Sequence, residues 1–262
     1  YWPFRTLALN ADDPAAAAQA DAVAELLSRR SPAAVLRLGP VSSHDRTVAS
    51  LVAGLRARGW RALRNEGGPV LGLDLPGDVA QLDACASPSL LKNIAYLRRR
   101  LVKQHGEVRA VRHVLDADSV STLATLERIE ASSWVAGGDA KFIGAANRRF
   151  WTALAAGRGG ACEVVFWLLY CGDEPVAFSA HFETPCVVYI VANSFDDRWK
   201  IHSPGSLLTF EVLRDAVTRG KSHVDWGQGD SGYKGRWGAK PSSTLFDVML
   251  FKRGWVGSSL HA

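Results

Sequence analysis

The alternation of apolar and polar residues from about position 107 to 252 predicts a continuous series of strands and helices. Strand-like runs are EVRAVRHV, CEVVFWLLYCG, EPVAFSAHFET, PCVVYIVANSF, SHVDWGQG and TLFDVMLFKRG. Helical spacing is found in DADSVSTLATLERIEASSW, GAANRRFWTALAAG and LLTFEVLRDAVTRG, and a short helical piece is expected around Tyr233 to Trp237. The predicted order is therefore β-α-α-β-β-β-α-β-α-β.

The first 86 residues predict fewer elements. We expect a helix over 12–30, the strand AVLRLG, a second helix over about 43–58, and two short strands, WRALRN and VLGLDLP. A turn through residues 66–69 is expected to join these two strands. This order is typical of the end of an α/β unit, and since the chain starts at Tyr1 rather than Met we expect part of its N-terminus to be missing.

A basic helix is predicted over residues 89–105, in the segment SPSLLKNIAYLRRRLVKQHG. Its leucine and isoleucine residues recur at helical spacing, and Gly106 is expected to end it. Two interpretations stay open: a solvated basic face, or a surface that holds the phosphates of a ligand or membrane head groups. The basic residues concerned are Lys92, Arg98, Arg99, Arg100 and Lys103.

Composition narrows the class of protein. The chain has 262 residues, of which 47% are hydrophobic, and this is enough for a buried core. Neither a membrane-spanning run nor a signal peptide is visible, so we expect a cytoplasmic protein. Four widely spaced cysteines predict buried free thiols, and no histidine or cysteine spacing suggests a metal site. The net charge of +5 is moderate and does not by itself predict an anionic partner.

A bend before the last long helix, WKIHSPGSLL, has the chemistry of a phosphate site. The first N–H groups of a helix lack internal partners and the helix dipole favours negative charge, so a diphosphate would dock there. The alternative is ordinary N-capping by a serine, with Pro204 in the first turn. The candidate donor-binding residues are Lys200, His202, Ser203, Gly205 and Ser206.

The segment DWGQGDSGYKGRWG, residues 225–238, combines many glycines with charged and aromatic side chains. A turn needs only one or two glycines, so this composition predicts backbone that approaches a substrate closely. The alternative is a glycine-rich surface loop held by Trp226 and Trp237. Its candidate site residues are Asp225, Asp230, Tyr233, Lys234 and Arg236.

Taken together, the element order and several motifs resemble the Gcn5-related N-acetyltransferase (GNAT) superfamily. The motifs are YLRRRL in the basic helix, SSWVAGGDAKF and RRFW in the two-helix region, SPGSLL, and the glycine-rich segment. The chain looks most like the branch named for the cellulose-biosynthesis protein CelD, and more distantly like the FemAB peptidyltransferases. The resemblance covers residues 87–252 well.

The resemblance implies an α+β fold with a mixed sheet, and two tandem domains. Residues 1–86 would be a partial N-terminal GNAT-like domain, and residues 87–262 a C-terminal GNAT-like acyltransferase domain. Two central strands of such a sheet splay apart, and the acyl thioester inserts between them. Tyr233 matches a tyrosine that protonates the departing thiolate, and Lys234 resembles a lysine directed at the acceptor.

The chemistry of amine acylation also needs a base near neutral pKa. Alternation along VAFSAHFE places Ser179, His181 and Glu183 on one strand face, which makes His181 the best-placed histidine. A strand histidine is also commonly a hydrogen-bonded core residue. Asp225 and Asp230 are rivals that would orient the amine or cap the short helix, and Trp134, Asp225 and Arg236 are candidates for acceptor binding.

The function that this resemblance implies is transfer of an acyl group from acyl-CoA, either acetyl-CoA or a longer ester, to an amine. The acceptor would be a cell-envelope precursor: an amino sugar, a polysaccharide unit or a sphingoid-type lipid base. Peripheral contact with the inner face of the membrane would use the basic helix 89–105, while neither a metal nor a nucleic-acid partner is expected. The alternatives are a FemAB-like transferase with an aminoacyl-tRNA donor, and a non-catalytic accessory module of exopolysaccharide assembly.

Overall fold

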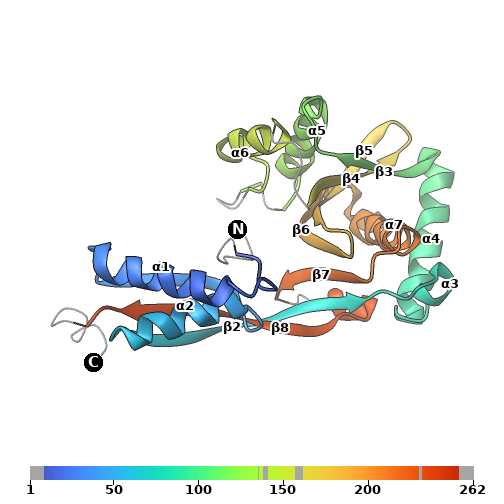
Figure 1. Cartoon of the computed structure of the whole chain (residues 1–262). Coiled ribbons are helices and arrows are strands. Elements are labelled where there is room, and N and C mark those ends of the chain that lie inside the picture. The colour runs from blue at the N-terminus through green and yellow to red at the C-terminus, as the bar shows by residue number, and fades with distance from the viewer. Residues whose placement is uncertain (1–8, 135, 138–140, 157–161, 230–231, 254–262) are drawn as a thin grey trace. The chain divides into compact units, whose positions relative to one another are not determined.

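The computed structural model describes residues 9–134, 136–137, 141–156, 162–229 and 232–253, and the chain divides into two compact units (Figure 1). The larger unit comprises Gly72–Lys240, and the smaller combines Trp2–Leu71 with Pro241–Ala262. The boundaries fall inside strand β2 (Arg61–Asp74) and at the start of strand β8 (Lys240–Phe251). Each unit has its own buried core.

The larger unit contains a mixed sheet with the strand order β7-β6-β5-β4-β3. The pairs β3–β4, β4–β5 and β5–β6 are antiparallel, whereas β6 and β7 are parallel. This confirms the predicted meander followed by one crossover. The strands are β3 (Val108–Val114), β4 (Glu163–Cys171), β5 (Glu174–Glu183), β6 (Val187–Phe195) and β7 (His223–Gln228).

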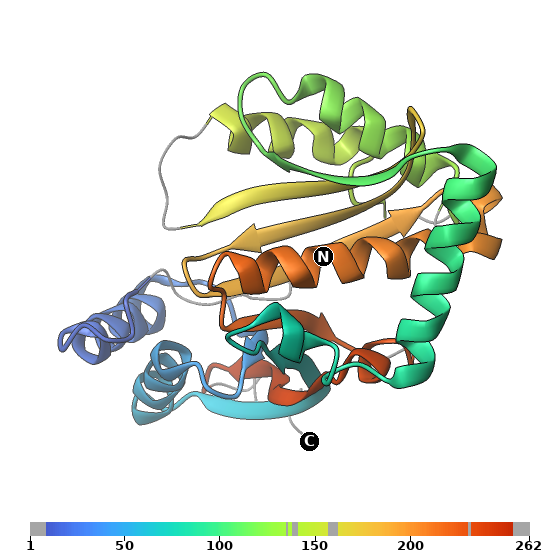
Figure 2. The ribbon, with the colours of Figure 1, turned by 90° about the vertical axis from the view of Figure 1, so that its right-hand side faces the viewer.

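Helices cover both faces of this sheet, as Figure 2 shows for the green α5 and α6 and the orange α7. Helices α5 (Val120–Ala131) and α6 (Ala145–Ala156) pack on one face, where Trp151, Phe166 and Phe178 are buried together. Helices α4 (Pro88–His105) and α7 (Pro204–Thr218) pack on the other face. The short elements are α3 (Val79–Leu82), η1 (Asp197–His202) and η2 (Lys234–Trp237). The predicted order of elements from β3 to β8 is confirmed.

Helix α4 is the predicted basic helix. The Ser87 hydroxyl accepts a hydrogen bond from the Leu90 N–H at its start, and Gly106 ends it with a φ of 84°. Its apolar stripe of Leu90, Ile94, Leu97 and Leu101 is buried, so the basic residues lie on the remaining faces.

The smaller unit consists of α1 (Ala16–Arg30), β1 (Val35–Ser42), α2 (Arg46–Ala57) and the greater parts of β2 and β8. Strands β1 and β8 pair antiparallel. The predicted turn at 66–69 is wrong, because β2 runs continuously from Arg61 to Asp74. The long strand β8 lies next to β2 in the sheet and provides hydrogen-bond partners for its extended backbone. Such pairing between strands outweighs a local preference for a turn. The assignment of 1–86 to a partial GNAT-like domain stays a prediction.

The four cysteines differ in environment. Cys171 is buried, and burial raises the pKa of its thiol to about 11. Cys85 is half-buried, whereas Cys162 and Cys186 are exposed, so the expectation of uniformly buried thiols is wrong. These two residues lie at the ends of strands, beyond the apolar runs that suggested burial. Among the described residues, no helix has the length and apolar character needed to cross a membrane.

Candidate active site

The parallel pairing of β6 with β7 stops partway along both strands. Val187 pairs with His223, Val188 with Val224, and Tyr189 with Asp225. Strand β6 continues to Phe195 and β7 to Gln228 with no further pairs between them in this described stretch. The backbone groups of β6 that face β7 beyond Tyr189 are therefore available to a ligand, as expected for a splayed sheet.

A β-bulge lies immediately beyond the last pair. His181 pairs with Ile190 and Ala180 with Ala192, so Val191 is an additional residue in β6. A bulge leaves one residue outside the ladder and redirects its backbone. The bulge thus places an unladdered peptide group two residues after Tyr189, where the pairing with β7 ends.

The bend after β6 leads into α7 through a left-handed residue. Ser203 has φ 48° and ψ 52°, and its side chain makes no capping hydrogen bond. Its carbonyl accepts from the N–H groups of Ser206 and Leu207, and Pro204 occupies the first turn. The predicted Pro204 position is confirmed, but no serine side chain caps this helix. Its positive dipole end therefore lacks a side-chain acceptor.

The end of the basic helix α4 meets this bend. The His105 ring lies 4.6 Å from the Trp199 ring and 5.7 Å from the His202 ring, measured between centroids. His202 is buried, and its Nδ1 has no hydrogen-bond partner among the described residues. Burial lowers the pKa of His202, and the charges of Arg100 and His105 lower it further. Arg100 thus exerts its charge on the bend, where Lys200 is also exposed.

Lys234 is buried in the glycine-rich segment, where it holds the loop together. Its Nζ donates to the carbonyls of Trp226 at 2.8 Å and Gly229 at 2.6 Å, with those of Gly227 and Gln228 at 3.3 Å. Gly227 and Gly229 have positive φ, which lets the backbone curl so that these carbonyls converge on the ammonium. The ammonium is thereby engaged by main chain, so these contacts support a scaffold role rather than contact with an acceptor.

Gly238 serves a different purpose in the same segment. A Cβ atom at this position would lie 2.4 Å from the Cys85 carbonyl oxygen, and φ is 86°. The glycine is therefore required by close backbone packing within the larger unit, not by a substrate.

Tyr233 lies across the space between β6 and the segment that follows β7. Its hydroxyl accepts a hydrogen bond from Asn193 Nδ2 at 3.4 Å, and Asn193 is on β6, two residues beyond the bulge. Tyr233 is half-buried. The predicted proton donor is thus brought to the unpaired part of β6.

Asp225 occupies the point where the two strands part. It pairs with Tyr189, and its Oδ1 accepts from the Gly227 N–H at 2.6 Å. Burial raises the pKa of Asp225 despite this hydrogen bond. A carboxyl group with a raised pKa at an opening in the sheet has the properties of a general base.

His181 has a different environment from the one a base requires. Its side chain is fully buried beneath α7, with Nε2 2.7 Å from the Ser179 hydroxyl and Nδ1 3.6 Å from Glu183 Oε1. The predicted common face of these three residues is confirmed. Burial lowers the pKa of His181. With no exposed surface, its ring has no direct route to a bound substrate.

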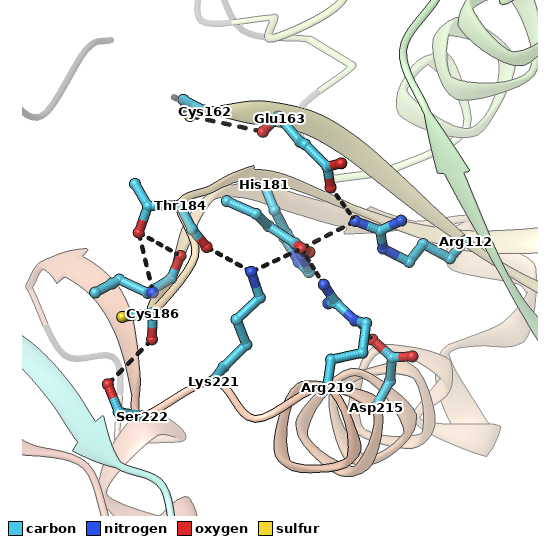
Figure 3. Close-up of polar contacts among 12 residues, drawn as sticks. Arg112, Cys162, Glu163, His181, Thr184, Cys186, Asp215, Arg219, Lys221 and Ser222 are labelled. Atoms are coloured by element: carbon cyan, nitrogen blue, oxygen red, sulfur yellow. Dashed lines mark hydrogen bonds and ion pairs between the residues drawn. The ribbon is translucent and has the colours of Figure 1, made fainter. Parts of the chain in front are cut away.

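Glu183 is the centre of a buried charged cluster, and Figure 3 labels its partners Arg112, Arg219 and Lys221. Its Oε2 lies 3.0 Å from Arg112 Nη2, 2.6 Å from Arg219 Nη1 and 3.9 Å from Lys221 Nζ. Arg112 also binds Glu163, and Arg219 binds Asp215. The cluster ties β3, β4, β5 and the end of α7 together. It therefore joins three neighbouring strands of the sheet to this helix.

The remaining predicted residues are placed as follows. Trp134 is 76% exposed, beyond the end of α5. Arg236 is exposed on η2 and its carbonyl accepts from the Ser87 N–H. Asp230 lies outside the described residues. In the described part of the chain, no group of three or more histidine, cysteine or acidic residues could hold a metal ion.

Sequence reasoning missed the contributions of Asn193, Tyr189 and Trp199. None of them carries a motif, and each gains its place from the pairing of strands or from a helix far away in the sequence. The one available signal was the basic segment ending at His105, whose position relative to the bend depends on how α4 packs.

A family model described as an acetyltransferase (GNAT) domain matches residues 88–235, more than half of the chain. A search of curated protein sequences gave no match.

Solved structures share the fold at low identity. FemX has 12% identity and a TM-score of 0.58, and the match covers 88% of this chain and 75% of FemX. The C-terminal DUF2156 domain of an Agrobacterium fabrum protein named as a lysylphosphatidylglycerol synthetase has 13% identity and a TM-score of 0.52, covering 86% and 70%. A conserved Bacteroides thetaiotaomicron protein of unknown function has 12% identity and a TM-score of 0.51, covering 84% and 69%. At these identities the likeness concerns the fold alone.

Proposed function

The chain belongs to the acetyltransferase (GNAT) domain family, and from this premise we propose that it transfers an acyl group from acyl-CoA to an amine in the gap between β6 and β7. The observation that carries the proposal is the end of pairing at Tyr189 and Asp225, next to the bulge at Val191. GNAT acetyltransferases use acyl-CoA. Which acyl-CoA donor and which amine acceptor this chain uses is part of our proposal.

The donor's diphosphate would bind at the bend before α7. Gly205 and Ser206 lie in the first turn of this helix, where the dipole favours an anion and no side chain acts as a cap. Arg100 of α4 adds positive charge on the same side, acting on His202. His202 Nδ1, buried without a partner in the described part, is a further group that would hydrogen-bond to the anion.

The protein's own groups carry out three steps of the reaction. Asp225 accepts the proton of the amine as the nitrogen attacks the thioester carbonyl carbon. The unladdered N–H at the Val191 bulge donates to the carbonyl oxygen as negative charge develops there. When the carbon–sulfur bond breaks, Tyr233 supplies a proton to the departing sulfur. His181 is given no step, because its ring is fully buried.

The acceptor we propose is an amine of a cell-envelope precursor: an amino sugar, a polysaccharide unit or a sphingoid-type base. This choice depends on the resemblance to the CelD-like branch. The site would work in the cytoplasm, with the exposed basic residues of α4 available for peripheral contact with anionic head groups.

The alternative donor, an aminoacyl-tRNA, is the one that the more distant resemblance to the FemAB peptidyltransferases implies. One experiment separates the two donors: titration of the protein with acetyl-CoA, longer acyl-CoA esters and charged tRNA, followed by calorimetry and melting temperature. We expect saturable binding of an acyl-CoA and a raised melting temperature. Salt-sensitive binding of tRNA alone would support the alternative, and indifference to all of these ligands would favour a non-catalytic module.

A further inference from the structure

A groove of about 900 Å³ lies between α4 and α7, on the side of the sheet away from α5 and α6. Ala110 on β3 and Trp167 on β4 contribute to its lining, together with Ile94 and Phe210 on the two helices. Figure 2 shows α4, in green, beside the orange α7. A volume of this size is typical of small-molecule sites. Its strands are separated from the β6–β7 gap by β5, so this is a second location on the larger unit.

Two buried N–H donors on neighbouring strands lack partners, and one of them belongs to a residue that lines this groove. Trp167 Nε1 and Arg112 Nε are both buried without a hydrogen-bond partner in the part of the chain that the structure describes. Arg112 and Trp167 are directly paired between β3 and β4, so their side chains leave the same face of the sheet. Trp167, which lines the groove, is only 6% exposed. Buried donors are almost always satisfied in native proteins, so two unpartnered donors in one strand pair indicate an absent acceptor.

Two other buried indoles of the chain have acceptors. Trp151 Nε1 donates to the Phe142 carbonyl at 3.1 Å, and Trp60 Nε1 donates to the Ser28 hydroxyl at 3.0 Å. Trp167 differs from both because its Nε1 has no acceptor among the described residues, and Trp167 lines the groove. The acceptor that is missing in the folded chain can therefore come from a molecule in the groove.

The charges around the groove favour an anion. Arg98 and Glu211 form an ion pair between α4 and α7, and the lining acid Asp215 is paired with Arg219. The other charged lining residues are Lys92, Arg214 and Asp83, and none of these three has an ion-pair partner among the residues described. Among the lining residues without an ion pair, two cations thus stand against one acid, in addition to the unpartnered indole N–H of Trp167.

We propose that this groove binds an amphipathic carboxylate. The carboxylate accepts a hydrogen bond from Trp167 Nε1, and Lys92 and Arg214 of the lining attract its charge. The apolar chain lies between α4 and α7 along Ile94 and Phe210. The inference does not depend on the acyl-CoA site, since no residue assigned to that site lines the groove.

Nuclear magnetic resonance of the indole N–H groups tests this directly. The full chain, labelled with ¹⁵N at tryptophan indoles, is titrated with decanoate, and the Trp167 signal is assigned by its loss in Trp167→Phe. We expect a saturable downfield shift of the Trp167 indole proton, while the Trp151 signal, already hydrogen-bonded, stays unchanged. Decyltrimethylammonium, which has the same chain length and the opposite charge, should leave the Trp167 signal in place.

A variant that blocks the groove gives an independent measurement. Ala95 is an exposed lining residue of α4, so Ala95→Trp should fold and weaken decanoate binding at least tenfold. Asn93→Trp adds the same side chain at an exposed α4 position outside the lining and should leave binding unchanged. An unmoved Trp167 signal at saturating decanoate, an equal shift with the cationic amphiphile, or full affinity in Ala95→Trp would each overturn the proposal.

Discussion

Tyr189 and Asp225 form the last residue pair between the parallel strands β6 and β7. Beyond this pair β6 contains a bulge at Val191, and Tyr233 reaches Asn193 from the segment after β7. A carboxyl group, a bulged peptide and a phenol are thus gathered around one opening in the sheet.

Asp225→Asn should lower kcat by about a hundredfold, the scale of one lost general base. Burial raises the pKa of Asp225, and the base must be ionised to accept a proton. Activity should therefore fall as pH decreases through a value above the ordinary pKa of an aspartate. A pH profile of kcat/KM measures this fall in activity at acidic pH. The same fall in the Asn variant would show that another group titrates.

Gly205→Asp should weaken acyl-CoA binding by roughly tenfold or more, because a carboxylate would stand where the diphosphate is expected. Gly205→Ala is the matched control. A Cβ at this position meets only Phe195 Cδ1 at 3.6 Å, an ordinary contact, so alanine should fold and bind normally. Calorimetric titration with acyl-CoA measures the affinity of both variants. Equal affinities would show that the diphosphate does not bind at the bend.

Tyr233→Phe should slow turnover while leaving the affinity for acyl-CoA unchanged. The substitution keeps the ring and removes the hydroxyl that faces Asn193. A loss of about tenfold to a hundredfold in kcat is the expected scale for one proton donor. Single-turnover kinetics together with donor titration separate the two effects, and wild-type turnover would exclude Tyr233 as the donor.

Lys234→Met should destabilise the larger unit by about 2 kcal/mol, since hydrogen bonds to a charged group are lost and the Trp226 carbonyl remains buried. The carbonyls concerned belong to residues 226–229. Arg236→Met, at an exposed position of the same short helix, should leave the free energy of unfolding unchanged. Urea unfolding measures both, and equal stability of the two variants would show that the Lys234 contacts contribute nothing.

Glu183→Gln should change the pH dependence of stability. Burial raises the pKa of Glu183, but His181 and the guanidinium groups of Arg219 and Arg112 outweigh it and hold the pKa well below its ordinary value. A lowered pKa gives stability that is complete above the unfolded-state pKa, about 4.3, and is lost as pH falls below it.

The Gln variant should therefore be less stable at neutral pH, by about 3 kcal/mol for a broken buried pair. It should also lose less stability than the wild type on acidification. Thermal or denaturant unfolding from pH 7 to pH 3 tests both statements. Parallel curves for the two proteins would mean that Glu183 does not stabilise the cluster through its charge.

The element order of the larger unit could be predicted from sequence because periodicity reports which face of an element is apolar. The helix from Pro88 to His105 and the strand from Glu174 to Glu183 both follow this rule. Alternation also placed His181 with Ser179 and Glu183, but it cannot tell which layer covers that face. Helix α7 covers it, and the expected base is therefore buried.

The glycine-rich segment shows a second limit. Its composition correctly predicted an unusual backbone conformation. It did not predict which groups this backbone surrounds. Gly227 and Gly229 curl around the Lys234 ammonium, and Gly238 makes room for Cys85. Both partners are set by tertiary packing. The predicted turn in β2 failed for the same reason, since a partner strand far away in sequence determined its conformation.

The most direct test of the account is a crystal structure of the protein with acetyl-CoA. The account predicts the diphosphate at the bend formed by Ser203, Gly205 and Ser206, and the thioester between β6 and β7 beyond Tyr189. Acetyl-CoA bound elsewhere on the chain, or β6 and β7 paired along their full length in the complex, would contradict it.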